Sequence, residues 1–130
     1  MATVTFRDES MTGKTLAEFD VPDLPSRISV GELIRLRVRE EVARYNAAPS
    51  RRFQGLVKPT DAEVELNGYR LDKPRRLDWE KQADAALEAF GRNGFIVLVG
   101  DRQVESPEEE IDLDAEPLVA FVRLVPLVGG

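Results

Sequence analysis

The residue types that carry out most protein chemistry are missing from this 130-residue sequence, which has no cysteine and no histidine. Thiolate nucleophiles, imidazole bases, disulfides and zinc sites of the usual ligand types are therefore excluded. Three features could still take part in binding or in a reaction: the triplet Gly13-Lys14-Thr15, a run of acidic residues between 105 and 116, and two glycines at 129 and 130. We expect a protein that is not an enzyme and that holds no metal or cofactor.

The first two features fit known sites poorly. Gly13-Lys14-Thr15 resembles the end of a phosphate-binding loop, but that motif requires a glycine five residues before Gly13, where the sequence has Asp8. The acidic run lacks the D-x-[DN]-x-[DN]-G pattern of a calcium loop, so we interpret it as a solvated surface. The diglycine is the feature that remains.

The charge of the chain favours protein partners. A net charge of −6 opposes nonspecific attraction to nucleic acid. The arginine pairs at 51–52 and 75–76 have almost no aromatic residues among them, which favours solubilising charges or contacts to acidic protein. No apolar run approaches the ~20 residues that span a bilayer, and the start of the sequence lacks a secretory signal pattern. We therefore expect a cytoplasmic protein that binds neither nucleic acid nor membrane.

Alternation of apolar and polar residues predicts a hairpin near the start of the chain. Val4 and Phe6 alternate with threonines, and Ala17, Phe19 and Val21 alternate with polar residues. Residues 8–14 contain turn-forming types, so the two strands should be antiparallel. We expect the second strand to end in the segment 21–25, because its prolines cannot donate a ladder hydrogen bond.

A helix over about residues 30–46 follows. Ser29 and Glu32 have the spacing of a capping box, and apolar residues recur at helical spacing from Val30 to Tyr45. The charged residues on the other face, which include Arg35 and Arg39, are interpreted as a solvated face.

The segment 47–94 then looks like an insertion that contains a hairpin around Asn67-Gly68 and a second helix. Asp78 should cap that helix, and Trp79, Leu87 and Phe90 share its apolar stripe.

The last third of the chain predicts two strands that are apolar on both faces. Residues 95–99 form the first, Gly100-Asp101 and a short return through residues 103–104 follow, and residues 118–125 form the second. The order is thus strand, strand, helix, inserted hairpin and helix, strand, strand. We predict an α+β fold of the β-grasp class, in which a mixed sheet wraps over one long helix and the first and last strands are parallel neighbours.

Particular residues carry a family resemblance. The segment 11–16, MTGKTL, resembles the first hairpin turn of ubiquitin, and the segment 96–104 resembles its third strand and the following turn. The segment 121–130 is similar both to ubiquitin and to the sulfur-carrier small subunit of molybdopterin synthase. The resemblance covers about residues 1–46 and 95–130. It implies a single ubiquitin-like domain over residues 1–130, with an insertion at about 47–94 and a flexible tail at about 126–130.

The resemblance also implies a function for the tail. An activating enzyme would adenylate the Gly130 carboxylate with ATP, and a conjugating enzyme would help to attach it to a target. A processing peptidase would be needed first if a precursor extends further. Gly129 and Gly130 lack Cβ atoms that would obstruct a narrow active site, and Pro126 would keep the exit extended. Pro126, Leu127 and Val128 are the predicted recognition residues of the tail.

A partner surface is predicted beside the tail. In a β-grasp one sheet face packs on the main helix, yet the last two strands are apolar on both faces. Either the inserted helix, with Trp79, Leu87 and Phe90, covers the second face, which we favour, or that face is an interaction patch for a partner enzyme or a second copy. Its candidate residues are Leu98, Val122 and Leu124.

Three functions remain open at this point. The first is a bacterial-type ubiquitin-like protein modifier that is conjugated through Gly130. The second is a sulfur carrier, in which Gly130 becomes a thiocarboxylate. The third is a noncovalent β-grasp adaptor, whose sheet face binds a partner while the tail is incidental.

Overall fold

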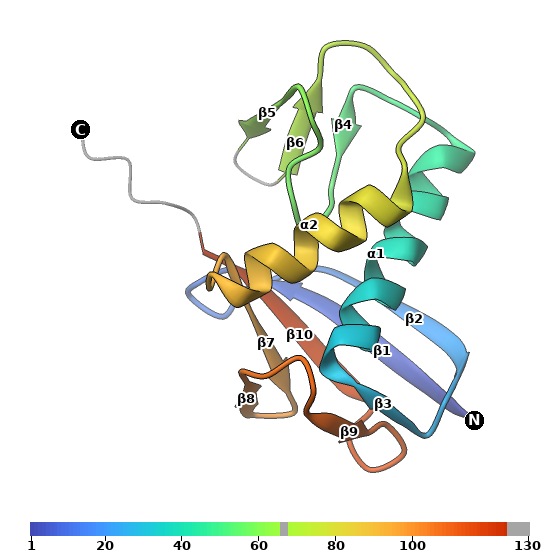
Figure 1. Cartoon of the computed structure of the whole chain (residues 1–130), viewed down its shortest axis with the longest axis vertical. Helices are drawn as coiled ribbons and strands as arrows, with labels where there is room; N and C mark the ends of the chain where they lie inside the picture. The colour runs from blue at the N-terminus through green and yellow to red at the C-terminus, as the bar shows by residue number, and fades with distance from the viewer. Residues whose placement is uncertain (66–67, 125–130) are drawn as a thin grey trace. The chain divides into compact units, whose positions relative to one another are not determined.

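The structure, a computed structural model, describes residues 1–65 and 68–124. The described residues form an α+β structure with a mixed sheet and two helices (Figure 1). The chain divides into two compact units. The first unit consists of Met1–Glu32 and Phe90–Gly130, and the second of Leu33–Ala89. The strands of the first unit are β1 (Ala2–Glu9), β2 (Thr15–Leu24), β3 (Arg27–Ser29), β7 (Phe95–Val99), β8 (Arg102–Val104), β9 (Glu110–Asp112) and β10 (Leu118–Arg123).

The main sheet has five strands in the order β2-β1-β10-β7-β8 among the described residues (Figure 1). β1 and β10 are parallel, with Phe6 opposite Val119, whereas β1 pairs with β2 and β10 with β7 in the antiparallel sense. The predicted first hairpin and the predicted parallel pairing of the first and last strands are therefore confirmed. This strand order is compatible with a β-grasp-like fold.

One face of this sheet carries the apolar core of the first unit. Phe6 on β1 contacts Phe19 on β2 and Phe121 on β10, with ring centroids 5.6 and 5.7 Å apart. Phe121 in turn contacts Phe95 on β7 at 6.4 Å. Edge-to-face and tilted rings at these distances add attraction to the burial of apolar area. This row of phenylalanines ties together the four strands that contain it.

The second strand ends within the predicted segment 21–25, at Leu24, although it first passes through Pro22. Two features let the strand include this proline. β2 is an edge strand, so the missing proline N–H faces away from the ladder, and the register shifts between the pairs Val4–Val21 and Ala2–Leu24, where Asp23 has a φ of 64°. Edge positions and bulges are where strands accept proline.

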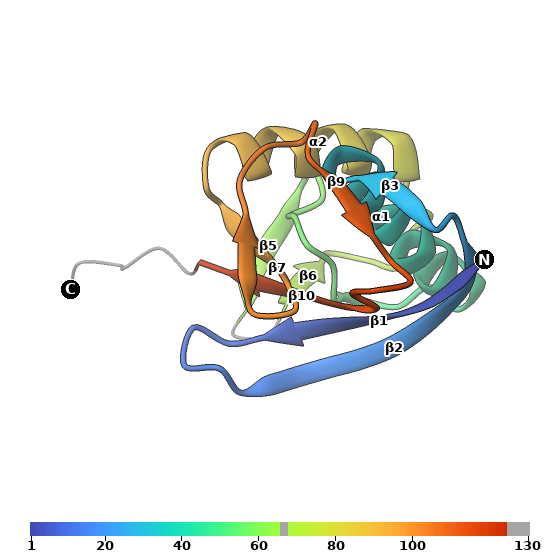
Figure 2. The same ribbon diagram turned by 90° about the horizontal axis from the view of Figure 1, so that it is seen from below.

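A short two-stranded sheet of β3 and β9 was not predicted. The two strands lie side by side (Figure 2), Ile28 pairs with Ile111, and both of these side chains are buried. β9 lies inside the acidic run, which is thereby tied to the start of the first helix: the Val30 amide donates to the Glu109 carbonyl at 2.8 Å. The acidic run thus contains a short strand, while Glu105, Glu108 and Glu110 remain exposed.

Both helices form where the sequence predicts them. α1 spans Val30–Ala47, and the Ser29 hydroxyl accepts the Glu32 amide at 3.1 Å, as the capping box requires. α2 spans Trp79–Gly91, and the Asp78 carboxylate accepts the Glu80 amide at 3.0 Å. These short polar side chains accept hydrogen bonds from amides that lack helical partners and so fix where each helix begins.

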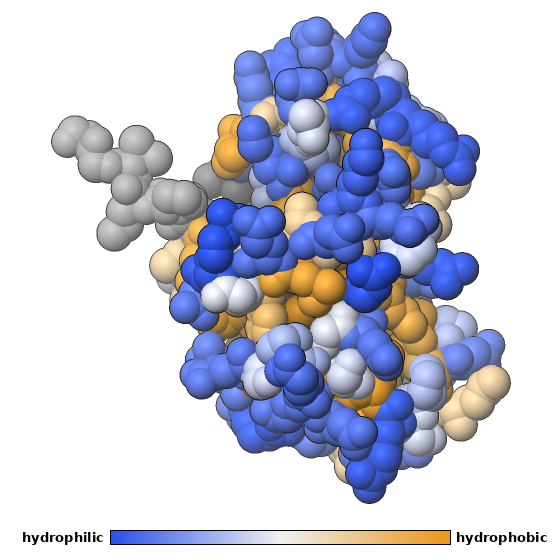
Figure 3. All heavy atoms as spheres, in the orientation of Figure 1, coloured by the Kyte–Doolittle hydropathy of each residue, from blue (hydrophilic) through white to orange (hydrophobic). Residues whose placement is uncertain are grey.

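The second unit also contains a small antiparallel sheet of β4 (Arg52–Phe53), β6 (Gly68–Leu71) and β5 (Ala62–Glu65), in that order among the described residues. β5 and β6 are the predicted hairpin, although its turn residue Asn67 lies outside the described residues. In the view of Figure 3, hydrophilic side chains cover most of the surface over these strands. Neither helix in the described part of the chain is long and apolar enough to cross a membrane.

Candidate functional site

The strand register of the main sheet shows which residues share each of its two faces. Leu98 on β7 lies opposite Ala120 on β10, and Ile96 lies opposite Val122. Because side chains alternate along a strand, these residues share the face that is opposite to the phenylalanine row. The predicted partner residues Leu98 and Val122 therefore do lie on one face, on adjacent strands.

The exposure of the predicted partner residues differs. Leu98 is half-buried, Val122 keeps only 6% of its surface exposed, and Leu124 is 37% exposed just after β10 ends. Two further half-buried residues, Ile96 and Leu118, belong to the same face. The sequence analysis did not name them, although they have the parity of Leu98 and Val122 and could have been found from it.

Polar contacts border this apolar strip on the side of β1 and β2. Arg7, whose partner on β10 is Ala120, donates to the Glu18 carboxylate at 2.9 Å. Thr5 donates to Asp20 at 2.7 Å on the same face. Five apolar residues of β7 and β10 form what we call the outer strip: Ile96, Leu98, Leu118, Ala120 and Val122. On the same face, β1 and β2 carry the polar and charged side chains. A partner that covers the outer strip would meet an apolar centre with a polar rim.

The inserted helix does not cover the outer strip with Phe90. That interpretation was favoured from the sequence, but the Phe90 ring lies 5.8 Å from the Phe95 ring, on the face of Val97 and Phe121. The reason is that α2 ends at Gly91, only four residues before β7 begins with Phe95, so Phe90 is carried to the core face. Trp79 contacts the guanidinium groups of Arg35 and Arg39 instead. Phe90 is thus not one of the residues that cover the outer strip.

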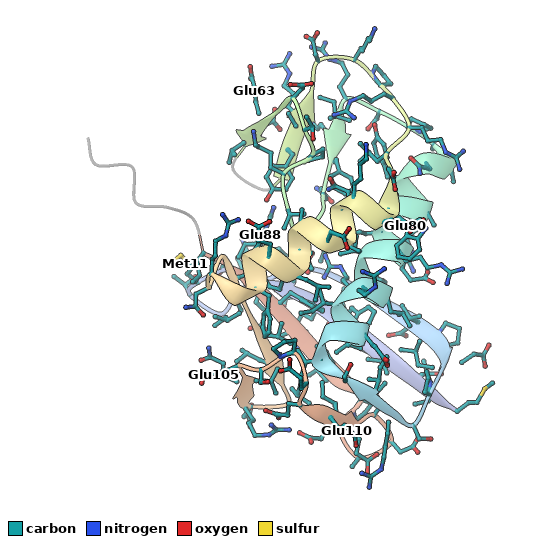
Figure 4. All side chains as sticks on the ribbon, in the orientation of Figure 1. Met11, Glu63, Glu80, Glu88, Glu105 and Glu110 are labelled. Carbon is teal, nitrogen blue, oxygen red and sulfur yellow. The ribbon has the colours of Figure 1, made fainter. Side chains whose placement is uncertain are left out.

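The described chain ends at one edge of the outer strip. Leu124 donates its amide to the Gly94 carbonyl at 3.2 Å, so the backbone contact between this segment and the start of β7 continues for one residue beyond β10. Because β10 is parallel to β1, this end lies beside the turn between β1 and β2, where Met11 is 61% exposed (Figure 4). The predicted tail residues Pro126, Leu127, Val128, Gly129 and Gly130 lie outside the described residues.

The Gly13-Lys14-Thr15 triplet forms part of a hairpin turn. Ser10 donates its amide to the Lys14 carbonyl at 2.8 Å, its hydroxyl accepts the Lys14 amide at 3.1 Å, and Gly13 has a φ of 88°. A strand follows at Thr15, whereas a phosphate-binding loop opens a helix. Glycine is needed here because other residues rarely adopt a positive φ.

The acidic run is organised by hydrogen bonds within the first unit. Arg102 on β8 pairs with Glu109 and Glu116, and its hydrogen bond to Glu109 raises the pKa of the guanidinium. The Ser106 hydroxyl donates to Glu108 at 2.6 Å and lowers the pKa of that carboxyl. No group of three or more acidic side chains within residues 1–65 and 68–124 is placed to hold a metal ion.

No protein-family profile, curated protein or solved structure matches this chain significantly.

Proposed function

We propose that the chain is a ubiquitin-like modifier with a β-grasp fold, activated at the carboxylate of Gly130. The observation that supports this most is the parallel β1–β10 pair at the centre of the order β2-β1-β10-β7-β8. The last central strand of that sheet leads directly toward the diglycine segment: β10 ends at Arg123, and residues 124–130 follow. The resemblance of the segments 11–16 and 96–104 to ubiquitin points the same way.

The chemistry belongs to partner enzymes, and the chain is their substrate. The Gly130 carboxylate attacks the α-phosphate of ATP, which forms an acyl adenylate and releases pyrophosphate. A nucleophile of the activating or conjugating enzyme, or an amine of the target, then displaces AMP. A peptidase exposes this carboxylate wherever a precursor continues beyond Gly130. Pro126, Leu127 and Val128 would lie in the entrance of the enzyme site, and Gly129 and Gly130 in its narrow end.

Deletion of residues 129–130 is expected to abolish covalent adducts. An N-terminally tagged chain would be expressed in its native host and purified under denaturing conditions, and its intact mass and gel mobility compared with those of the deletion. Gly91→Ala is the matched control, because a Cβ at this exposed glycine meets no atom within 4 Å. Adducts in the parent and in Gly91→Ala, absent from the deletion, establish a modifier.

Other outcomes of this comparison select between functions. A single species whose mass gain equals the replacement of one oxygen by sulfur would identify the chain as a sulfur carrier instead. The absence of both adducts and that species would rule out the role of the tail.

The outer strip favours a second candidate function, a noncovalent adaptor. A partner would cover Leu98 and its half-buried neighbours Ile96 and Leu118, whereas Ala120 and Val122 of the strip are already buried. Self-association through the same strip is the simplest form of this function.

Leu98→Arg is expected to abolish capture of proteins through this strip, because a buried guanidinium at the centre of an interface costs several kcal/mol. The matched control is Gln54→Arg, which adds the same group at an exposed residue of the second unit, outside the main sheet. Native co-purification from the host and sedimentation of the pure protein would be measured for both. The adaptor function would be contradicted if the parent and Leu98→Arg captured the same proteins in equal amounts and sedimented with the same molecular mass.

A further inference from the structure

A groove of about 360 Å³ lies in the second unit, between α1 and the segment that leads into α2. α1 supplies the floor, and Arg76 and Trp79 supply the opposite wall. All residues that line it belong to the same compact unit, and none of them is acidic: Arg39, Val42, Ala43, Asn46, Ala47, Arg76 and Trp79.

The floor of the groove is a helical stripe. The α1 residues that line it follow each other at spacings of three, four, seven and eight from Arg39, which places them on one side of the helix. Val42 is buried, while Ala43 and Ala47 are exposed. At 1.5 Å per residue the stripe is about 12 Å long, the length of roughly four residues of extended chain. The site is elongated and has an apolar floor.

The opposite wall is held in place by hydrogen bonds. The side-chain amide of Asn46 donates to the Leu77 carbonyl and accepts the Leu77 amide, both at 2.9 Å. This pair fixes the segment before α2 against α1. Two guanidinium carbons, those of Arg35 and Arg39, lie 5.6 and 5.7 Å from the centre of the Trp79 ring. Cation–π contacts at this distance orient both the ring and the arginines.

Two arginines at the rim have no acidic partner in the part of the chain that the structure describes. Arg39 and Arg76 are exposed and form no ion pair there, whereas Arg35, one turn before Arg39, reaches Asp84 at 3.2 Å. An arginine fork that is oriented by a ring but has no anion is suited to bind a carboxylate at two points. The groove therefore combines an apolar floor with two positive charges.

We propose that this groove binds an extended acidic segment of a partner protein, with an aliphatic side chain on the floor and carboxylates at Arg39 and Arg76. Charge complementarity supports this occupant, because the lining carries two cations and no anion. The elongated shape favours an extended peptide over a compact ligand. Nucleic acid is disfavoured because the whole chain has a net charge of −6. This site belongs to the second unit and does not depend on the function of the tail.

Trp79 makes the proposal directly measurable, since it is the only tryptophan in the sequence. The probe is a free peptide EEEIDLDAE, which combines acidic and aliphatic residues and has the sequence of residues 108–116. Titration into the full chain is expected to shift Trp79 fluorescence in a saturable way, more weakly at high salt. A peptide with lysine in place of each acidic residue should give no shift. Removal of residues 129–130 should leave the affinity unchanged.

Variants of the chain distinguish peptide binding in the groove from attraction by the overall charge of the protein. Arg39→Glu with Arg76→Glu is expected to weaken binding by roughly tenfold or more, because each carboxylate loses a charge-assisted hydrogen bond. Ala43→Phe, which fills the exposed floor without changing charge, should weaken it similarly. The matched control Arg51→Glu changes another exposed arginine of the same unit that does not line the groove, and should have little effect.

Three results would overturn the proposal. The first is the absence of any saturable fluorescence shift with the acidic peptide in the folded parent. The second is an effect of Arg51→Glu as large as that of the groove variants, since binding would then reflect overall charge. The third is tighter binding of an oligothymidylate of the same charge through the same two arginines, which would assign the groove to nucleic acid.

Discussion

Replacement of Arg37 by alanine is expected to lower the free energy of unfolding by about 3–5 kcal/mol, because it removes the positive charge that compensates a buried carboxylate. The side chains of Arg37 and Glu41 are only 1% and 5% exposed, and Arg37 Nε donates to Glu41 Oε2 at 2.9 Å. Glu41 Oε1 also accepts the Leu56 amide at 3.2 Å. The pair therefore joins two turns of α1 to the loop that follows β4.

The control for this prediction is Arg39→Ala, an exposed arginine of the same helix. Its loss should cost less than about 1 kcal/mol, even with its contact to Trp79, because exposed charges contribute little. Urea unfolding of both variants would give the free energies. If Arg37→Ala cost no more than Arg39→Ala, the pair could not be buried in solution as it is in the structure.

A double variant tests the cause of the loss. Arg37→Met with Glu41→Gln removes both charges but keeps a side-chain oxygen for the Leu56 amide. It should recover most of the stability lost in Arg37→Ala, because the penalty arises from the lone charge rather than from the missing attraction. No recovery would mean that the guanidinium contributes through packing or other hydrogen bonds.

The same pair shows what the sequence could not predict. Helical spacing reveals that Arg37 and Glu41 lie one turn apart, but on most helices such pairs are exposed. The loop after β4 lies close to this pair, since a Cβ added at Gly55 would be 3.1 Å from Glu41 Oε1. Contact with a loop outside the helix leaves no periodic signal in the helix sequence.

The elements that were predicted are those with a local signal. α1, α2 and the first hairpin each have a cap or a repeat of apolar residues within about 20 residues of chain, and all three form. The β3–β9 sheet has three residues in each strand and joins segments that are far apart in sequence. A single buried isoleucine in each strand cannot reveal such a pairing.

The candidate sites also differ in whether a local sequence pattern could predict them. Leu98 and Val122 were assigned to one face correctly because strand parity is local. The arginines of α1 were interpreted as a solvated face, yet Arg35 and Arg39 lie over Trp79, which is 40 or more residues away in sequence. The groove beside Trp79 depends on the bonds of Asn46 to Leu77, which no pattern predicts.

Phe121→Ala is expected to be the most damaging single change in the main sheet, with a loss of about 3–5 kcal/mol. Phe121 is 1% exposed on the central strand β10, and its ring contacts Phe6 on β1 and Phe95 on β7. Alanine at this position leaves a cavity between both neighbouring strands and removes two aromatic contacts at once. Such a loss is a large part of the 5–15 kcal/mol that stabilises an ordinary domain.

Because Phe121→Ala could fail to fold, Phe121→Leu provides a milder step that keeps most of the apolar volume and should cost less than half as much. Leu118→Ala is the matched control on the same strand, since Leu118 is half-buried and points to the opposite face. Urea unfolding of the three variants, with m-values compared to exclude a change in cooperativity, should rank the losses as Phe121→Ala, Phe121→Leu, Leu118→Ala. Equal losses for Leu118→Ala and Phe121→Ala would mean that the face of the outer strip is packed as tightly as the phenylalanine row. A partner could then not bind at that strip without displacing something that already covers it.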